Sequence, residues 1–243
     1  MSAVAYDEST RKPRMAPTGL PPAARSFLLQ TGAVAIAVGI ASSLAQSRDG
    51  RWSTFVVLLL AVLGAQAAAT HVAGNQVFHT GLAFTVAAAV SLQPRQVIAI
   101  CIVQHLADWA RQRYAWYIQI FNIANYTVSA LAAWAANKAV LSSASEPPRV
   151  LHVAAAAAGG AAFVLTNHAL LARMLRLARG YSLRATGLFS LDGLLTDAGL
   201  AATGVAVALT LQHNLPVAVV AAFPLILIHR VLVTPAARRG VST

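Results

Sequence analysis

Eight apolar segments, separated by short polar stretches, follow one another along most of the chain. They cover residues 26–46, 53–70, 77–93, 95–110, 117–139, 150–173, 186–212 and 214–232. A helix needs about 20 apolar residues, with a range of about 17–25, to cross a lipid bilayer. The pattern therefore predicts an all-α fold, a polytopic transmembrane helical bundle of about eight spans. Two neighbouring segments are short and meet at Pro94, so six spans plus a re-entrant pair is the alternative.

The two ends of the chain are polar. Residues 1–25 contain four prolines and four basic residues, a composition that favours a disordered tail. A cleaved signal peptide would have a shorter basic region and a better cleavage site than Ala45-Gln46-Ser47. We therefore expect a disordered basic cytoplasmic tail over 1–25, a transmembrane helical domain over 26–232, and a short cytoplasmic tail over 233–243.

Basic residues are distributed unequally between alternate loops. With the N-terminus inside, thirteen of the 18 Lys and Arg residues fall on the inside and five on the outside. The outside set is Arg48, Arg51, Arg95, Lys138 and Arg149. Because cytoplasmic loops carry an excess of Lys and Arg, we predict that both termini face the cytoplasm.

Composition supports a membrane protein and argues against other classes. The chain is 58% hydrophobic and 10% charged, with a mean hydropathy of +0.64, whereas soluble domains carry about 25% charged residues. The net charge of +11 comes from short arginine clusters between apolar runs, which fits anionic lipid and topology rather than nucleic acid. Abundant alanine and the preference for arginine over lysine indicate a GC-rich bacterial genome. We therefore expect a bacterial inner membrane around this chain and no nucleic-acid partner.

Small residues are concentrated in two of the predicted helices. Segment 53–70 contains Gly64 among several alanines, and segment 150–173 contains a run of small residues around Gly159 and Gly160. Small faces allow the backbones of membrane helices to approach closely. The alanine-rich composition explains any single position equally well.

Two acidic residues lie within the apolar segment 186–212. Asp192 is near its cytoplasmic end, within reach of interfacial water, whereas Asp197 is deeper. A polar side chain at membrane depth is costly and needs a partner or a role. We expect Asp197 to be a neutral carboxylic acid that is hydrogen-bonded to a neighbouring helix. A proton or cation pathway is the alternative, although such pathways usually use acidic residues on several helices.

His105 and Asp108 are three residues apart and share one face of a predicted helix. A carboxylate beside a histidine orients the imidazole in many zinc sites, and His71, His79 and His168 are further candidate ligands. A local hydrogen bond near the cytoplasmic end of the segment is the alternative. Because compact ligand spacings such as HExxH or CxxC are absent from the sequence, we expect no metal.

A second polar group lies at the start of segment 117–139, just after an arginine-rich turn with three aromatic residues. It consists of Phe121, Asn122, Asn125 and Tyr126. Basic residues, then aromatic residues, then an apolar helix is the order found at a membrane interface. We expect the two amides to hydrogen-bond across helices, which contributes about 0.6–2 kcal/mol each. A small-molecule pocket lined by the four residues is the alternative.

Signatures of soluble enzymes are absent from the sequence. It contains no Gly-rich phosphate loop and no GxSxG, and Cys101 lies in an apolar run. We therefore expect a non-catalytic protein without a cofactor.

Three stretches resemble a known family. Residues 117–126 (YIQIFNIANY) resemble the FN-x-A-N/Q-Y helix of the multi-helix membrane modules that precede GGDEF and HD-GYP domains in bacterial signalling proteins. Residues 78–84 resemble the first apolar span of those modules, and residues 214–230 resemble their last span. The resemblance covers about residues 50–235 and implies a sensor-like membrane module.

The chain departs from the pattern of that family after its last apolar segment. Thr243 stands close to the point where the cyclic-di-GMP synthase or hydrolase domain of such proteins begins, so catalysis is not carried over. We predict a non-catalytic, sensor-like module that acts through a cytoplasmic or membrane signalling partner at its Arg-rich face. The alternative is a small-molecule transporter or the substrate-binding membrane subunit of one. Oligomerisation is compatible with either function.

Overall fold

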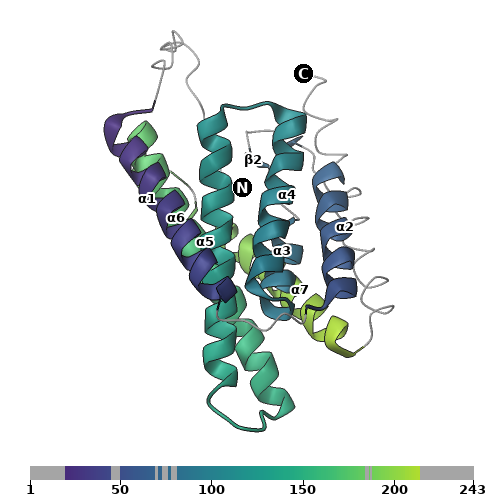
Figure 1. The fold of residues 1–243 in the computed structure, drawn as a ribbon. Helices are drawn as coiled ribbons and strands as arrows, with labels where there is room; N and C mark the ends of the chain where they lie inside the picture. Colours follow the sequence, from purple (N-terminus) through teal and green to yellow (C-terminus); the bar gives the residue numbers. More distant parts are fainter. Residues whose placement is uncertain are drawn as a thin grey trace.

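The computed structural model describes residues 20–44, 50–68, 71–72, 76–77, 81–183, 186 and 188–213. They form the helices α1 (Pro22–Leu44), α2 (Trp52–Ala68), α3 (Gly81–Ser91), α4 (Pro94–Gln112), α5 (Trp116–Leu141), α6 (Arg149–Arg179) and α7 (Leu191–His213) (Figure 1). A two-residue antiparallel ladder joins β1 (His71–Val72) to β2 (Gln76–Val77). The predicted all-α fold is confirmed. The predicted segment 214–232 and the tail over 233–243 lie outside the described residues, as do residues 1–19 and 78–80.

Local chemistry explains where the helix ends differ from the predicted ones. α1 begins at Pro22, so the predicted tail over 1–25 is four residues too long. Proline is favoured at the first helical position because its missing N–H is not needed there. α6 continues to Arg179 and ends where Gly180 adopts a φ of 70°, a left-handed conformation that suits glycine. The Ser190 hydroxyl accepts a hydrogen bond from the Gly193 N–H at 3.1 Å, which caps the start of α7.

Three of the described helices are long and apolar enough to cross a membrane. They are Pro22–Leu44, Arg149–Arg179 and Gly193–Gln212. The predicted count of eight spans is therefore not supported. α2 and α3 have 17 and 11 residues, or about 26 Å and 17 Å at 1.5 Å per residue, against a hydrocarbon core of about 30 Å. α4 and α5 are longer, but amide and charged side chains such as Gln104, Asp108 and Asn125 make them less apolar.

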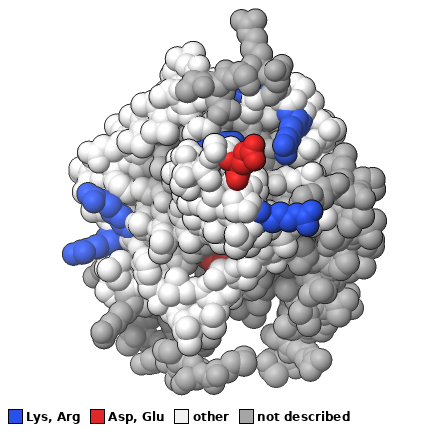
Figure 2. Space-filling model, turned by 90° about the horizontal axis from the view of Figure 1, so that it is seen from below, with Lys and Arg blue, Asp and Glu red and all other residues white. Residues whose placement is uncertain are grey.

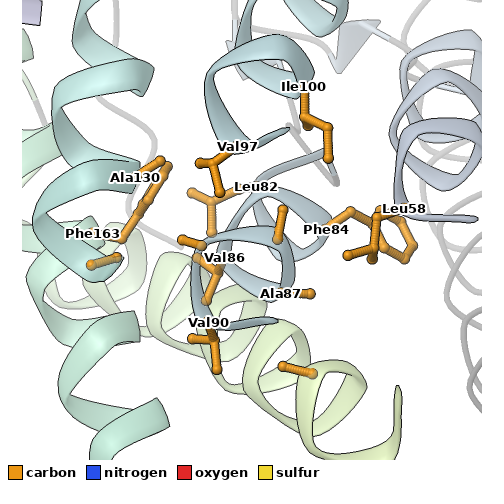
Figure 3. Close-up of a cluster of buried hydrophobic side chains, with 14 of the residues drawn as sticks. Leu58, Leu82, Phe84, Val86, Ala87, Val90, Val97, Ile100, Ala130 and Phe163 are labelled. Carbon is orange, nitrogen blue, oxygen red and sulfur yellow. The ribbon is translucent and has the colours of Figure 1, made fainter. Parts of the chain in front are cut away.

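α3 lies among the other helices and forms the centre of the core (Figure 1). All of its residues from Gly81 to Val90 are buried. Figure 3 shows Val86 and Val90 in a cluster with Phe163 of α6 and Ala130 of α5, and Phe84 beside Leu58 of α2. α7 packs against the same helix through Gly204, whose missing side chain leaves room for the Ala83 backbone. The short segment is therefore an enclosed core helix.

Contacts along the helices define two ends of the bundle. On α5 and α6, Asn125 lies beside Asn167 and Ala133 lies beside Gly159, so these helices are antiparallel. The rings of Phe27 and Phe121 are 6.4 Å apart, which places the start of α1 at the start of α5. We call this the basic end, and we call the opposite end, which carries the loop 142–148, the hairpin end.

Described basic residues are more numerous at the basic end. Those at the basic end are Arg25, Arg111, Arg113, Arg173, Arg176 and Arg179. Those at the hairpin end are Arg51, Arg95, Lys138 and Arg149. Figure 2, which views the molecule from the hairpin end, shows a described surface that is largely uncharged with a few Lys and Arg side chains.

The outer surface of the bundle is apolar, whereas its interior holds many polar side chains. On α1, Leu29, Ile36 and Leu44 are 72%, 65% and 81% exposed. The buried polar residues include Gln66, Thr85, Gln96, Gln104, His105, Asp108, Gln119, Asn125, Asn137, Asn167 and His168. Isolated exposed apolar residues are normal in soluble proteins, but amides and histidines are usually found outside their cores. The bundle therefore combines an apolar outer surface with a hydrophobic core that also holds these buried polar side chains.

Candidate functional site

Two adjacent polar residues of α6 connect it to the helices on either side. Asn125 Nδ2 of α5 donates a hydrogen bond to Asn167 Oδ1 at 2.6 Å. His168 Nε2 lies 2.6 Å from Asp197 Oδ2 of α7. Because a helix turns about 100° per residue, neighbouring positions face different partners. Asn167 and His168 therefore bridge three helices in the interior of the bundle.

The His168–Asp197 pair is enclosed on the histidine side and more open on the carboxylate side. His168 is 1% exposed and Asp197 is 27% exposed. The ring of Phe189 meets the imidazole edge-on, with 5.7 Å between the centroids. Among the described residues, no hydrogen-bond partner reaches His168 Nδ1. The contact therefore joins a fully buried imidazole to a carboxylate that is partly exposed at the surface of the bundle.

Close helix contacts support both sides of this arrangement. A Cβ on Gly159 would lie 3.0 Å from the Ala133 carbonyl oxygen of α5, and one on Gly160 would lie 3.3 Å from Val205 of α7. Each glycine stands eight residues before the polar residue that faces the same helix. The small residues predicted to permit close packing in α6 therefore do so at these two positions, because eight residues complete slightly more than two turns.

Aromatic contacts extend the buried network toward α4. The rings of His105 and Tyr126 meet edge-on with 4.4 Å between centroids, and Tyr126 meets Phe163 edge-on at 5.6 Å. Edge-to-face contacts of this kind contribute about 0.5–1.5 kcal/mol beyond the area that they bury. They join α4, α5 and α6 at the same level as the amide pair.

A second polar cluster fixes the turn between α4 and α5 at the basic end. Asp108 accepts hydrogen bonds from Gln112 Nε2 at 2.7 Å and from the Tyr114 hydroxyl at 2.8 Å. The same hydroxyl lies 3.0 Å from Gln119 Oε1, and the Trp109 indole donates to the Tyr114 carbonyl oxygen at 2.9 Å. Burial, and then the adjacent Asp108 carboxylate, raise the pKa of Tyr114 above its usual value. The hydroxyl therefore stays protonated at neutral pH and acts as a donor.

The residues singled out from the sequence do not form a single pocket. Phe121 packs with Phe27 of α1 and Met174 of α6, whereas Tyr126 belongs to the main core. Asn125 faces Asn167, and Asn122 lies near the Tyr114 hydroxyl. Their side chains serve different helix contacts, although they are close in sequence.

His105, Asp108 and Asp197 also take separate places. His105 contacts Tyr126, Asp108 belongs to the turn cluster, and Asp197 pairs with His168 on the far side of α6. From the sequence, His168 was identified only as a candidate metal ligand, and Asn167 was not identified at all. The signal for both was two consecutive polar residues within the apolar run of α6.

Neither a metal site nor a similar protein indicates a function for these residues. Among the described residues, no group of three His, Cys, Asp or Glu side chains is placed to hold a metal ion. No family model, no curated protein and no solved structure matches this chain.

Proposed function

We propose that this chain is an integral protein of a bacterial inner membrane that works as a non-catalytic, sensor-like module. The observation that supports it is the apolar outer surface of the bundle together with the polar side chains buried within its core. In hydrocarbon, a polar group needs a partner within the protein, and apolar side chains can face the lipid at no cost. The buried amides and the His168–Asp197 pair meet the first condition, and the outer residues of α1 meet the second.

In this proposal α1, α6 and α7 cross the membrane and α2, α4 and α5 surround the short α3 at membrane depth. The basic end faces the cytoplasm, in accord with its larger share of arginine. Trp52 at the hairpin end and Trp116 at the basic end are 59% and 65% exposed, as expected of aromatic residues at the two interfaces. Both termini are cytoplasmic in the arrangement that we propose.

Reporter fusions test this orientation. Alkaline phosphatase, which is active only in the periplasm, should be active when fused after Ser143 in the hairpin-end loop. It should be inactive when fused after Gly180 at the basic end. The same two positions fused to a cytoplasm-active fluorescent protein should give the reverse result. Periplasmic activity at Gly180 would contradict the orientation.

α6 connects the buried polar residues to the basic end of the bundle, where a cytoplasmic partner could bind. After Asn167 and His168, the helix continues to Arg173, Arg176 and Arg179, which are exposed and spaced by three residues on one side. A rigid helix transmits a displacement at one end to the other. A cytoplasmic partner with an acidic surface would therefore sense a change in the interior through this arginine row.

Co-purification from native membranes tests the signalling role. The wild-type chain should retain a specific partner, and the Arg176→Gln/Arg179→Gln double variant should lose most of it, because the electrostatic contacts at the end of α6 are removed. Arg149→Gln, at the opposite end of the same helix, is the matched control and should retain the partner. Equal recovery with all three chains would exclude the arginine row as a docking site.

A small-molecule transporter is the second candidate, and one observation favours it. His168 and Asp197 form an ionisable pair inside the bundle, and proton relays in transporters use such groups. Proton flux into vesicles distinguishes the two functions, because the sensor-like module requires none.

A further inference from the structure

A groove runs along one side of the bundle between α1, α4 and α5. It encloses about 650 Å³, within the range of about 300–1,000 Å³ that is typical of ligand sites. Its walls are mainly aliphatic and include Ile36 and Ile40 of α1, Ile102 of α4 and Ile123 of α5. Ile36, Ile40 and Ile102 are also exposed on the outer surface, so the groove opens sideways. In the membrane arrangement proposed above, on which this inference rests, the opening faces lipid.

Two residues with polar side chains lie at one end of the groove. Arg95, the second residue of α4, lines it at the hairpin end together with Ser43 near the end of α1. A guanidinium carries five N–H donors, so it can hold a phosphate oxygen and keep other contacts. The remaining lining along α1 extends from Leu44 back to Gly32, a length of about 18 Å at 1.5 Å per residue. One leaflet of the hydrocarbon core is about 15 Å deep, so the groove has the depth of a single leaflet.

We infer that this groove binds one acyl chain of an anionic phospholipid from the bilayer, with Arg95 at the phosphate. Lipid tails are as apolar as the groove, so moving a chain into it yields little hydrophobic free energy. Selectivity therefore comes from the headgroup, where Arg95 distinguishes an anionic lipid from a zwitterionic one. Shape then determines whether a chain can lie beside α1.

Two substitutions separate the headgroup contact from the chain contact. Arg95→Gln removes the charge and should weaken retention of phosphatidylglycerol by about tenfold, as for loss of a charge-assisted hydrogen bond. Gly32→Leu fills the groove, and a Cβ at Gly32 meets nothing within 4 Å, so the helix should tolerate it. Gly64→Leu of α2, which is equally open and outside the groove, is the matched control. Arg149→Gln is the control for charge at the same end.

The full-length chain is reconstituted in nanodiscs of mixed phosphatidylglycerol and phosphatidylcholine, and the lipids retained after release are counted by native mass spectrometry. We expect one phosphatidylglycerol on the wild-type chain and on both controls, about a tenth of that on Arg95→Gln, and none on Gly32→Leu. Circular dichroism verifies folding. If Gly32→Leu fails to fold, Ile36→Trp, at an exposed position in the wall, takes its place.

Several results would overturn the inference. They are equal retention by all chains, no preference over phosphatidylcholine, retention of added oleate instead of phospholipid, or a dimer of the wild-type chain that Gly32→Leu converts to monomer. The proposed membrane location is tested by a separate measurement, made before the lipids are counted. A chain that washes from membranes without detergent would contradict the membrane location, and the lipid site with it.

Discussion

Replacing Gly204 by alanine should destabilise the protein by about 3 kcal/mol, at the upper end of the usual cost of overpacking. The added Cβ would overlap the Ala83 carbonyl oxygen and would lie 3.0 Å from Val86 Cβ. Both groups belong to α3, which is enclosed on every side and has no room to retreat. α7 must therefore separate from α3, and the cavity that opens between them adds to the cost.

Gly199 provides the control on the same helix. A Cβ there meets nothing within 4 Å, so Gly199→Ala should gain up to about 1 kcal/mol from the higher helix propensity of alanine. Unfolding in detergent by increasing denaturant, followed by circular dichroism, measures both variants. Opposite signs of the two changes are the expected result. Similar stability of Gly204→Ala and the wild type would show that α7 does not pack on α3 through this position.

Removing the His168–Asp197 contact should produce the second large effect. Asp197→Ala leaves a buried imidazole without its hydrogen-bond partner, and His168→Ala removes a side chain that fills space in the core. Each should cost about 2–3 kcal/mol, and the double variant should cost about 2 kcal/mol less than the sum of the two. Breaking the Asn125–Asn167 hydrogen bond should cost less, because Asn125→Ala should destabilise the protein by about 0.6–2 kcal/mol.

The same variants separate the two candidate functions. In sealed vesicles with a pH gradient, the sensor-like module should show no proton flux with wild-type protein or with Asp197→Asn. Flux through the wild-type chain that Asp197→Asn abolishes would establish a transport pathway and overturn the sensor proposal. For the stability measurement, a coupling free energy near zero between the His168 and Asp197 substitutions would show that their 2.6 Å contact contributes nothing to stability.

The sequence predicts that a helix is present in the regions of α1 and α6, but it misses two of the helix ends. The predicted segments begin at residue 26 and end at residue 173, whereas α1 begins at Pro22 and α6 continues to Arg179, before Gly180. The segment 77–93, which contains α3, is predicted as a span or as half of a re-entrant pair because its residues are as apolar as those of α1. The difference lies in what surrounds each helix, since α3 is covered by the described helices α2, α4, α5, α6 and α7, whereas α1 exposes Leu29 and Leu44. Residue pattern alone does not record those neighbours.

For each pair of contacting polar side chains, the sequence indicates that one residue needs a partner but does not identify that partner. An amide at position 125 in an apolar helix requires a hydrogen bond, and the sequence indicated this need. That the partner is Asn167, 42 residues later, follows from the antiparallel packing of α5 and α6, which has no local signature. The partner of Asp197 is likewise not predictable from the sequence, because His168 lies on another helix. The groove depends on the separation of α1 from α4 and α5, and separations between helices are a property of the assembled bundle.

The enclosed position of α3 has a consequence for biogenesis. In the proposed membrane arrangement, segments enter the bilayer in order of synthesis, and α3 is too short to be stable in lipid by itself. Its cover is completed by α7, which begins 100 residues after α3 ends. A nascent chain that stops before Leu191 therefore presents an open α3 surface to chaperones and membrane proteases. Among the described helices, α7 is the last to cover α3, so its synthesis closes this surface.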